Sequence, residues 1–205
     1  CLRPVSRYFD RITRPEQLIP AVNRAIQVLT DPADCGPVTL CIPQDVQAEA
    51  YDYPESFFQE RVWRPRRLRP DVDEVAYAAC ALKAAKKPLI IAGGGVLYSE
   101  ASASLMKLAE MTGIPVCETQ GGKSSLPDGH SLNMGAIGVT GTSASNRLAE
   151  EADLILAVGT RLQDFTTGSW ALFKNDGKTI VGLNVQPFDA AKHRALTLVA
   201  DAREG

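Results

Sequence analysis

Residue types that bind phosphate groups recur in four short segments, and each segment follows an apolar run. The segments are 93–95, with three consecutive glycines, 119–125, 159–164 and 184–189. Glycine lets the backbone approach a ligand because it has no Cβ, while hydroxyls, an arginine and backbone N–H groups donate to anions. If the apolar runs are parallel strands, all four segments emerge at one edge of the sheet, where open α/β folds bind ligands. The sequence therefore predicts a crevice suited to a dinucleotide or a phosphate.

These segments, together with a glycine-rich stretch at 135–142, supply the candidate binding residues. Arg161 is the best single candidate for holding an anion, and the alternative is a surface ion pair with Asp164. Lys123 could meet an anion or could be a solvated loop lysine. The candidate cofactor-binding residues are Gly93, Gly94, Gly95, Thr119, Gly121, Lys123, Gly141, Thr142, Gly159, Arg161 and Asn184.

The standard nucleotide motifs are incomplete. Tyr98 stands where a G-x-G-x-x-G pattern would have its third glycine, although Glu118 lies where a ribose-binding acid would be. The stretch 122–124 reads Gly-Lys-Ser, but Cys117 occupies the position of the first P-loop glycine. A standard NAD site and a P-loop are therefore not expected.

Catalytic and metal-ligating patterns are absent from the sequence. The two histidines, His130 and His193, have no Cys or carboxylate at metal-ligand spacing. No serine or cysteine stands in a nucleophile-elbow setting. The chain is therefore expected to hold no metal and no catalytic residue of its own.

Alternating strands and helices position the glycine-rich segments. Unbroken apolar runs predict buried strands, at 37–43, 89–92, 114–118, 154–158, 179–184 and 196–200. Capping patterns predict helix starts, at Thr13, Asp71 and Ser99, and residues 143–152 read as a further short helix. This alternation predicts an α/β fold, a Rossmann-like parallel sheet flanked by helices.

Helical spacing also predicts which residues face the core. The helix that begins at Asp71 is expected to turn one apolar face inward, formed by Val72, Val75, Ala76, Ala79 and Leu82. The helix capped by Ser99 is expected to end at Gly113, since glycine is the preferred residue just after a helix.

The chain divides into two parts and a linker. Residues 1–46 read as a helix and a strand that end one α/β domain, and 71–205 as a second domain that possibly lacks its last helix. Residues 47–70 have no sustained period and carry three prolines, which indicates an interdomain linker. The five arginines of 61–69 fit a solvated or interface linker, with anion binding as the alternative. The chain opens on Cys1 in mid-pattern, so we expect a fragment of a longer protein.

Composition excludes several classes of partner. With 22 basic and 24 acidic residues, the net charge of −2 indicates neither a nucleic-acid nor a membrane-surface partner. No run is long and apolar enough to span a membrane, and no signal peptide is visible. The five cysteines form no C-x-x-C pair and are expected to be free thiols, mostly buried, in a reducing cytoplasm.

The sequence also resembles a known family. Residues 36–46, Gly-Pro-Val-Thr-Leu-Cys-Ile-Pro-Gln-Asp-Val, are similar to the G-P-V-x-x-x-I-P-x-D-V signature that closes the pyrimidine-binding domain of thiamine-diphosphate enzymes of the acetolactate synthase type. The following domain resembles their central domain. The segments that hold FAD in FAD-binding members occur in the family's order and spacing, at 93–95, 118–123, 138–142, 159–164 and 184–186. The resemblance covers nearly all 205 residues.

Narrower similarities, at 44–54 and 158–169, are to the members that open the ring of trihydroxycyclohexane-1,2-dione in myo-inositol catabolism. They imply a carbon–carbon bond hydrolase with a cyclic dione as substrate. The resemblance also implies thiamine diphosphate and Mg²⁺, a homo-oligomer with active sites between subunits, and a cytoplasmic enzyme. The alternatives are a bond-forming enzyme like acetolactate synthase or glyoxylate carboligase, or a non-catalytic nucleotide-binding or scaffold module.

Two sets of family residues differ or are missing. The glutamate that activates the cofactor and the G-D-G…N-N motif that binds Mg²⁺ and diphosphate belong to the flanking domains and are not found in this chain. The chain alone is therefore expected to be inactive. FAD-binding members usually have an aspartate where Asn184 stands and a histidine where Thr140 stands. These differences predict that FAD is not bound and that the crevice is vestigial.

Overall fold

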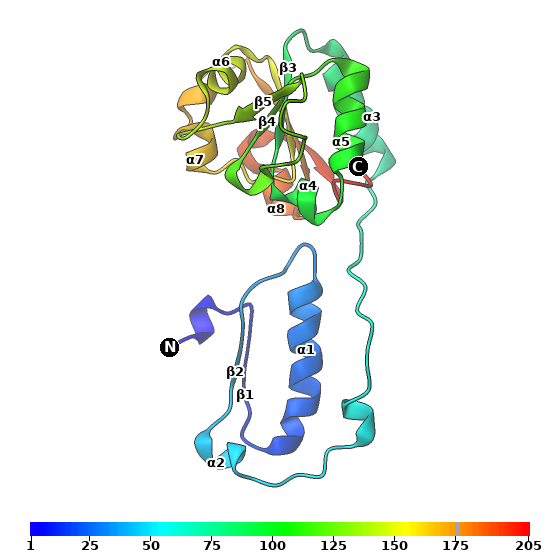
Figure 1. Ribbon diagram of the computed structural model, residues 1–205, viewed down its shortest axis with the longest axis vertical. Coiled ribbons are helices and arrows are strands. Elements are labelled where there is room, and N and C mark those ends of the chain that lie inside the picture. The colour runs from blue at the N-terminus through cyan, green and yellow to red at the C-terminus, as the bar shows by residue number, and fades with distance from the viewer. Residues whose placement is uncertain (175–176) are drawn as a thin grey trace. The chain divides into compact units, whose positions relative to one another are not determined.

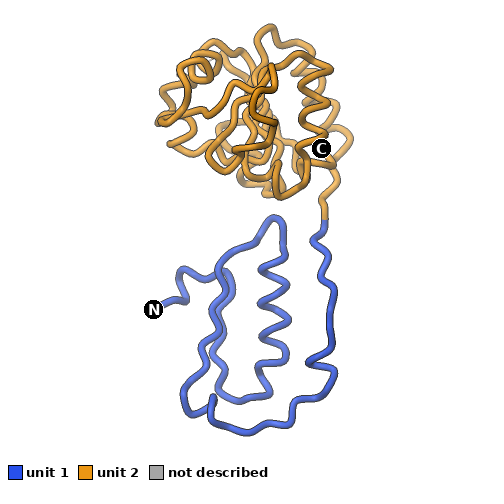
Figure 2. Tube along the Cα trace, in the orientation of Figure 1, with its two compact units in different colours: residues 1–66 blue, residues 67–205 orange. Residues whose placement is uncertain are grey.

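The computed structural model describes residues 1–174 and 177–205. They form two compact units, Cys1–Arg66 and Arg67–Gly205 (Figure 2). Each unit has its own buried apolar cluster.

The larger unit is built on a six-stranded sheet in which every neighbouring pair is parallel (Figure 1). Its strands are β3 (Pro88–Ala92), β4 (Val116–Glu118), β5 (Asn133–Ala136), β6 (Leu154–Val158), β7 (Thr179–Asn184) and β8 (Leu196–Val199). The spatial order is β5-β4-β3-β6-β7-β8. If β3, the first strand of this sheet in sequence, is counted as strand one, this is the strand order of dinucleotide-binding folds. The predicted Rossmann-like parallel sheet is confirmed.

Helices cover both faces of this sheet (Figure 1). On one face lie α3 (Val72–Ala84) and α5 (Ser102–Thr112), and on the other α6 (Ser143–Glu151) and the 3₁₀ helix η5 (Ala171–Phe173). Short helical turns follow the strands or connect them; they are α4 (Gly94–Tyr98), η4 (Gln120–Gly122), α7 (Asp164–Thr167), α8 (Pro187–Ala190) and η6 (Lys192–Arg194).

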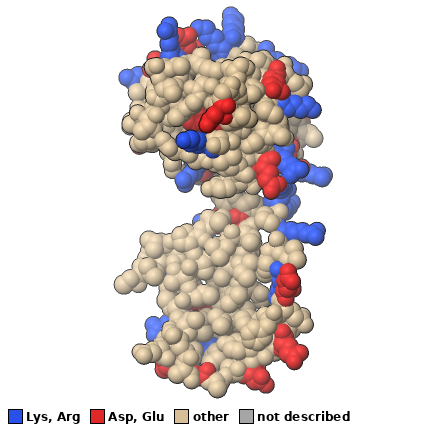
Figure 3. Space-filling model, in the orientation of Figure 1, with Lys and Arg blue, Asp and Glu red and all other residues tan. Residues whose placement is uncertain are grey.

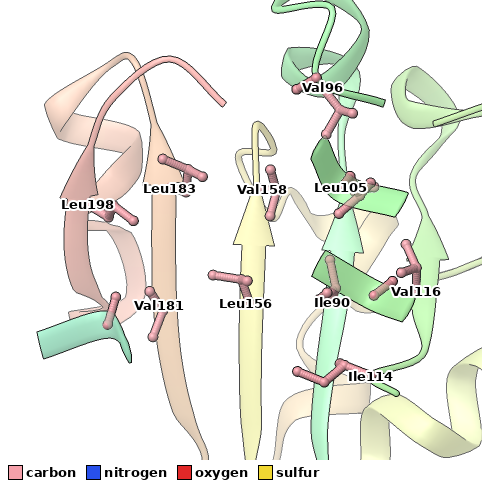
Figure 4. Packing of buried hydrophobic residues seen from close by; sticks show 14 of the residues in the cluster. Ile90, Val96, Leu105, Ile114, Val116, Leu156, Val158, Val181, Leu183 and Leu198 are labelled. Atoms are coloured by element: carbon pink, nitrogen blue, oxygen red, sulfur yellow. The ribbon is translucent and has the colours of Figure 1, made fainter. Parts of the chain in front are cut away.

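Side chains of the central strands alternate between two apolar cores. In β3, Ile90 packs with the α3 and α5 side while Ile91 packs with the α6 side. In β6, Leu156 likewise packs on the α3 and α5 side and Ala157 on the α6 side. Figure 4 shows the first core, in which Ile90 of β3 lies beside Leu105 of α5 and Val181 of β7 extends the same cluster across the sheet. Because both faces are covered, these strands are continuously apolar rather than alternating, as parallel sheets require.

The smaller unit pairs only two strands. β1 (Tyr8–Arg11) and β2 (Val38–Cys41) are parallel, with α1 (Leu18–Thr30) between them in sequence. Its other elements are η1 (Arg3–Val5), η2 (Pro15–Gln17), α2 (Gln44–Gln47) and η3 (Glu55–Phe57). The buried strand predicted at 37–43 is present, but its residues are only half-buried. A two-stranded sheet has too few neighbours to bury a strand fully.

Several sequence expectations differ from the structure. Strands β1 and β5 and the turn α4 were not expected from the sequence. Ser99 does not cap a helix: its hydroxyl donates to the Asp201 carboxylate at 2.9 Å, and α5 begins at Ser102. Gly113 does end α5, with φ of 70°.

The start of α1 uses a different capping side chain from the one expected. The side-chain oxygen of Gln17, not that of Glu16, accepts from the backbone N–H of Thr13 at 2.8 Å. Glu16 instead pairs with Arg14. Pro20 falls in the first turn of α1, where a missing N–H costs little.

The predicted inner face of α3 is wrong. Val72 is 79% and Val75 37% exposed, and Ala76 is exposed too. Leu82 packs against the core as expected, together with Ala78, which was not expected to face inward. Asp71 caps α3 as expected, accepting from the N–H groups of Asp73 and Glu74. The reason for the rotation is Glu74, whose carboxylate accepts from the backbone N–H of Val199 in β8 at 2.8 Å.

The cysteine thiols differ in how far they are exposed. Cys117 is buried, and burial raises the pKa of its thiol to about 11. Cys1, Cys35 and Cys80 are exposed, so the expectation that the thiols are mostly buried is wrong.

Basic and acidic side chains both occur on each unit, on the face of the molecule that Figure 3 shows. Among the described residues, no helix has the length and apolarity needed to cross a membrane.

An ion pair closes the larger unit where the chain enters it. Asp201, 4% exposed, receives hydrogen bonds from Arg67 at 3.0 Å and from the Ser99 hydroxyl. The Asp201 N–H donates to the carbonyl of Leu68 at 2.9 Å. Residues 67 and 68 are therefore fixed to the carboxyl-terminal end of the chain by both side-chain and backbone bonds.

The substitution Asp201→Ala should destabilise the larger unit by about 3 kcal/mol, because it leaves the buried Ser99 hydroxyl without its acceptor and leaves Arg67 with only the exposed Glu100 as an ion-pair partner. The matched control is Glu204→Ala, whose carboxylate lies 3.8 Å from the exposed Arg69. It should cost under about 1 kcal/mol. Urea unfolding, with hydrogen exchange to assign the transition to the larger unit, measures both. Equal losses for the two variants would contradict this account.

Candidate functional site

The segments predicted to form a crevice do meet at the carboxyl edge of the sheet. Turn α4 follows β3, η4 follows β4, residues 159–164 follow β6, and residues 184–189 follow β7. The strand order reverses between β3 and β6, and such a switch point is the usual ligand position of this fold.

At the switch point the two loops touch backbone to backbone. The N–H of Gly93 donates to the carbonyl of Val158 at 2.8 Å, and the N–H of Gly95 donates to Gly159 at 3.0 Å. A Cβ on Gly93 would lie 2.3 Å from the Gly159 oxygen, and one on Gly95 2.6 Å from the Gly159 Cα. Gly159 itself has φ of 59°. These glycines are therefore required by contact between segments of the chain itself.

The loop after β4 is held in the same way. A Cβ on Gly122 would lie 2.2 Å from the carbonyl oxygen of Ala92. Gly94 and Gly121 face each other, and a Cβ on Gly94 would be 3.1 Å from the Gly121 oxygen. The three loops after β3, β4 and β6 thus pack as one block of glycine backbone.

Most of the N–H groups expected to bind phosphate already donate within the chain. Besides Gly93 and Gly95, the N–H of Thr119 donates to Ala92 at 2.9 Å and that of Gly159 to Leu183 at 2.8 Å. On the loop after β5, Gly141 donates to Gly138 and Thr142 to Ala136, each at 2.9 Å. A phosphate bound by these particular N–H groups would have to displace backbone hydrogen bonds.

Polar side chains join the loops to one another. The Asn184 amide donates to the carbonyl of Thr160 at 3.3 Å and accepts from the N–H of Gln186 at 3.0 Å. The side chain of Gln120 donates to the Thr140 hydroxyl at 2.8 Å. Asn184 and Thr140, the two positions that differ from FAD-binding members, therefore both bridge neighbouring loops.

The remaining candidate side chains have separate roles. Thr119 accepts from the N–H of Gly122 at 3.1 Å, and Thr142 caps α6 by accepting from Ser145 at 3.1 Å. Lys123 is exposed. Arg161 is exposed too. Among the described residues, Arg161 and Asp164 do not form the ion pair that was the alternative role for Arg161.

Glu118 does not face outward as a ribose-binding acid would. Its side chain is buried, and its carboxylate accepts from the N–H of Leu126 at 3.0 Å. Glu118 therefore ties its own loop, residues 119–126, back to the end of β4.

Sequence reasoning missed a cluster of strained residues beside these loops. Leu162, Trp170 and His193 all have positive φ angles, of 44°, 70° and 61°. The ring centroids of Trp170 and His193 are 4.4 Å apart, with the ring planes tilted by 35°, and a His193 ring nitrogen lies 3.3 Å from the Leu162 carbonyl oxygen. None of the three is a glycine, so the sequence carried no signal for these conformations.

No three His, Cys, Asp or Glu side chains of residues 1–174 and 177–205 gather closely enough to hold a metal ion. The two histidines are also apart in their contacts: His130 lies 3.2 Å from Glu110 on α5, whereas His193 packs on Trp170. The arrangement can brace loops against one another, but the described residues bring together no metal-ligand set, and the histidine–carboxylate contact they contain is that of His130 with Glu110.

Comparison with known proteins identifies the fold and a set of relatives. Residues 75–205 match the family described as thiamine pyrophosphate enzyme, central domain. A protein of Mycobacterium smegmatis, described as a thiamin diphosphate-dependent enzyme, is 23% identical over 98% of this chain and 38% of its own, with a TM-score of 0.74. At that identity the likeness shows the fold alone.

Two curated relatives are much more similar in sequence. A 3D-(3,5/4)-trihydroxycyclohexane-1,2-dione hydrolase 1 of Bacillus cereus is 51% identical over 202 residues, which are 98% of this chain and 31% of that protein. A hydrolase of the same substrate from Geobacillus thermodenitrificans is 51% identical over 203 residues, 99% of this chain and 32% of its own. The chain spans about a third of the length of these relatives.

Two adjacent glycines of η4 test the packing role of the loops. Gly122→Ala should destabilise the larger unit by at least about 2 kcal/mol, because the new methyl group would overlap the Ala92 backbone. Gly121→Ala is the matched control: the nearest atom to its Cβ would be at 3.6 Å, and its effect should stay within about 0.5 kcal/mol. Urea unfolding of both variants decides. A tolerated Gly122→Ala would mean that the glycine serves something other than this contact.

The substitution Asn184→Asp tests the loop bridge and its pH dependence. An aspartate cannot donate to the Thr160 carbonyl while ionised, so the larger unit should lose about 1–2 kcal/mol at neutral pH. The carboxyl's folded pKa should be raised, which makes the loss greatest above that pKa and smaller as the pH falls and the carboxyl can donate again. The free energy of unfolding of the variant and of the parent chain, measured from pH 7 to about pH 4, shows whether the difference between them follows this trend. A loss that grows on acidification would contradict the bridge.

Proposed function

The chain belongs to the thiamine pyrophosphate enzyme family through its central domain, and from this premise we propose that the whole protein hydrolyses 3D-(3,5/4)-trihydroxycyclohexane-1,2-dione. The observation that carries the proposal is the identity of about half of all residues to hydrolases of that substrate, sustained over 98% of the chain. The identity extends over both units rather than over the central domain alone, as expected if both come from the same kind of enzyme.

The proposed reaction opens the ring between its two carbonyl carbons. Water supplies a hydroxyl to one carbonyl carbon, which becomes a carboxylic acid, and a proton to the other, which becomes an aldehyde. Thiamine diphosphate, when bound with Mg²⁺, would supply stabilisation of the carbanion that the bond cleavage creates. We propose that both are held by domains outside this chain, since the described residues offer no metal-ligand cluster.

The role proposed for this chain is positional. The larger unit would be a rigid central domain, and residues 1–46 the end of a pyrimidine-binding domain joined to it by residues 47–70. Rigidity at the carboxyl edge comes from the glycine contacts and from the Asn184 and Gln120 bridges. Such a domain can hold the flanking domains at a fixed spacing without touching the substrate.

We further propose that the crevice binds no nucleotide. Two observations support this proposal. The N–H groups of Gly93, Gly95 and Gly159 already donate to backbone carbonyls. The Glu118 carboxylate is buried and accepts from the N–H of Leu126. The residues named as candidates, with Lys123 and Arg161 at the surface, would then be a nucleotide site in ancestry only. The full-length protein is proposed to act as a homo-oligomer.

The full-length protein incubated with the cyclic dione, thiamine diphosphate and Mg²⁺ should give the ring-opened aldehyde acid, read by NMR, and should need both cofactors. The 205-residue chain at the same concentration is the control and should give no product. Condensation of pyruvate or glyoxylate with the dione left intact would instead identify a bond-forming enzyme. The purified protein should also be colourless, and flavin absorbance in its spectrum would overturn the empty crevice.

A further inference from the structure

Helix α3 is apolar on the side that faces away from its own core. Of its thirteen residues only Asp73, Glu74 and Lys83 are charged, and Glu74 is turned inward to β8. The α3 outer face, as we define it, consists of Val72, Val75, Ala76, Ala79 and Cys80. Val72 is 79% and Val75 37% exposed, and Ala76 and Cys80 are exposed as well.

A helix at the surface of a soluble domain normally has an apolar stripe toward the core and a polar face toward water. α3 already buries Ala78 and packs Ala81 and Leu82 against the core. At 100° per residue, Val72, Val75, Ala76, Ala79 and Cys80 form an apolar arc that adjoins that stripe and continues it around the outer side of the helix. Four residues of this arc, Val72, Val75, Ala76 and Cys80, are exposed, and Ala79 is half-buried; an exposed apolar surface of this kind is the pattern of a helix with a further partner.

Charge at the two ends of α3 indicates what that partner is. The exposed acidic residues Asp71 and Asp73 stand at its amino end, and the exposed lysines Lys83 and Lys86 stand at its carboxyl end. A copy of α3 laid antiparallel would bring the acidic end of each helix to the basic end of the other. A two-fold axis requires such a self-complementary surface.

We propose that the α3 outer face is an interface between two copies of this chain, with the two helices antiparallel across a two-fold axis. The axis passes near the middle of α3, where the small side chains of Ala76, Ala79 and Cys80 let the helices approach to about 8 Å. Asp73 of each copy then lies near Lys83 of the second copy, at the edges of an apolar centre. The proposal rests on the self-association proposed above, and it is independent of the chemistry of the dione.

Sedimentation equilibrium of the 205-residue chain measures the interface without reading catalysis, so its failure and that of the hydrolase assignment are distinguishable. The chain should dimerise. Ala76→Glu should weaken the dimer by at least about 100-fold, because it buries two carboxylates near the axis. Ala103→Glu, the same change at an exposed alanine of α5, should leave the dissociation constant within about two-fold.

A charge exchange tests the antiparallel direction. Asp73→Lys and Lys83→Asp should each weaken the dimer about 10-fold, because each creates two like-charge contacts per dimer. The double variant should recover the parent affinity within about three-fold, since opposite charges face each other again. Recovery cannot come from helix stability, because both changes oppose the helix dipole.

Three results would overturn the proposal. A chain that stays monomeric would mean that another part of the same chain, or nothing, covers α3. A dimer unaffected by Ala76→Glu would place the interface elsewhere. A double variant weaker than either single one would exclude the antiparallel arrangement.

Discussion

The larger unit depends on the contact between the loops that follow β3 and β6. These are the two central strands of the sheet, and their ends meet where the strand order reverses. Gly93 and Gly95 lie so close to Gly159 that no side chain fits between them, and their N–H groups donate to the carbonyls of 158 and 159. At the place where this fold usually binds a ligand, the two loops therefore touch backbone to backbone. The loops after β4 and β7 are then held through Gly122 and Asn184.

Most of the residues that suggest a binding site from sequence, though not the exposed Lys123 and Arg161, thus have a structural role within the fold. A glycine is needed both where a phosphate approaches and where another strand end approaches, and sequence alone does not distinguish the two. Asn184 illustrates the point: the amide donates to one loop and accepts from another, a role that an ionised aspartate cannot fill. This supports our proposal that the domain has a positional role in an enzyme whose chemistry belongs to other domains.

The sequence predicted the sheet well and its details unevenly. Strands buried on both faces are recognisable in the sequence as apolar runs, and β6 and β7 have the bounds predicted for them. Strand β5 was missed because its residues, Asn133 to Ala136, are half-buried at the sheet edge and include a glycine with φ of 83°. The inner face of α3 was misjudged because the helix is apolar all round, so periodicity could not say which side faces the core; Glu74 decided it by bonding to β8. The positive φ angles at Trp170 and His193 arise from tertiary contacts that no local pattern encodes.

The central claim is that the N–H groups at the switch point are used inside the fold and not by a nucleotide. Amide hydrogen exchange of Gly93, Gly95 and Gly159, followed by NMR with and without added FAD, tests it directly. The account predicts strong protection of all three amides in the free chain, and no change on addition of FAD, because each N–H already donates to a backbone carbonyl. Rapid exchange in the free chain that becomes slow with FAD would contradict it and would make the crevice a working nucleotide site.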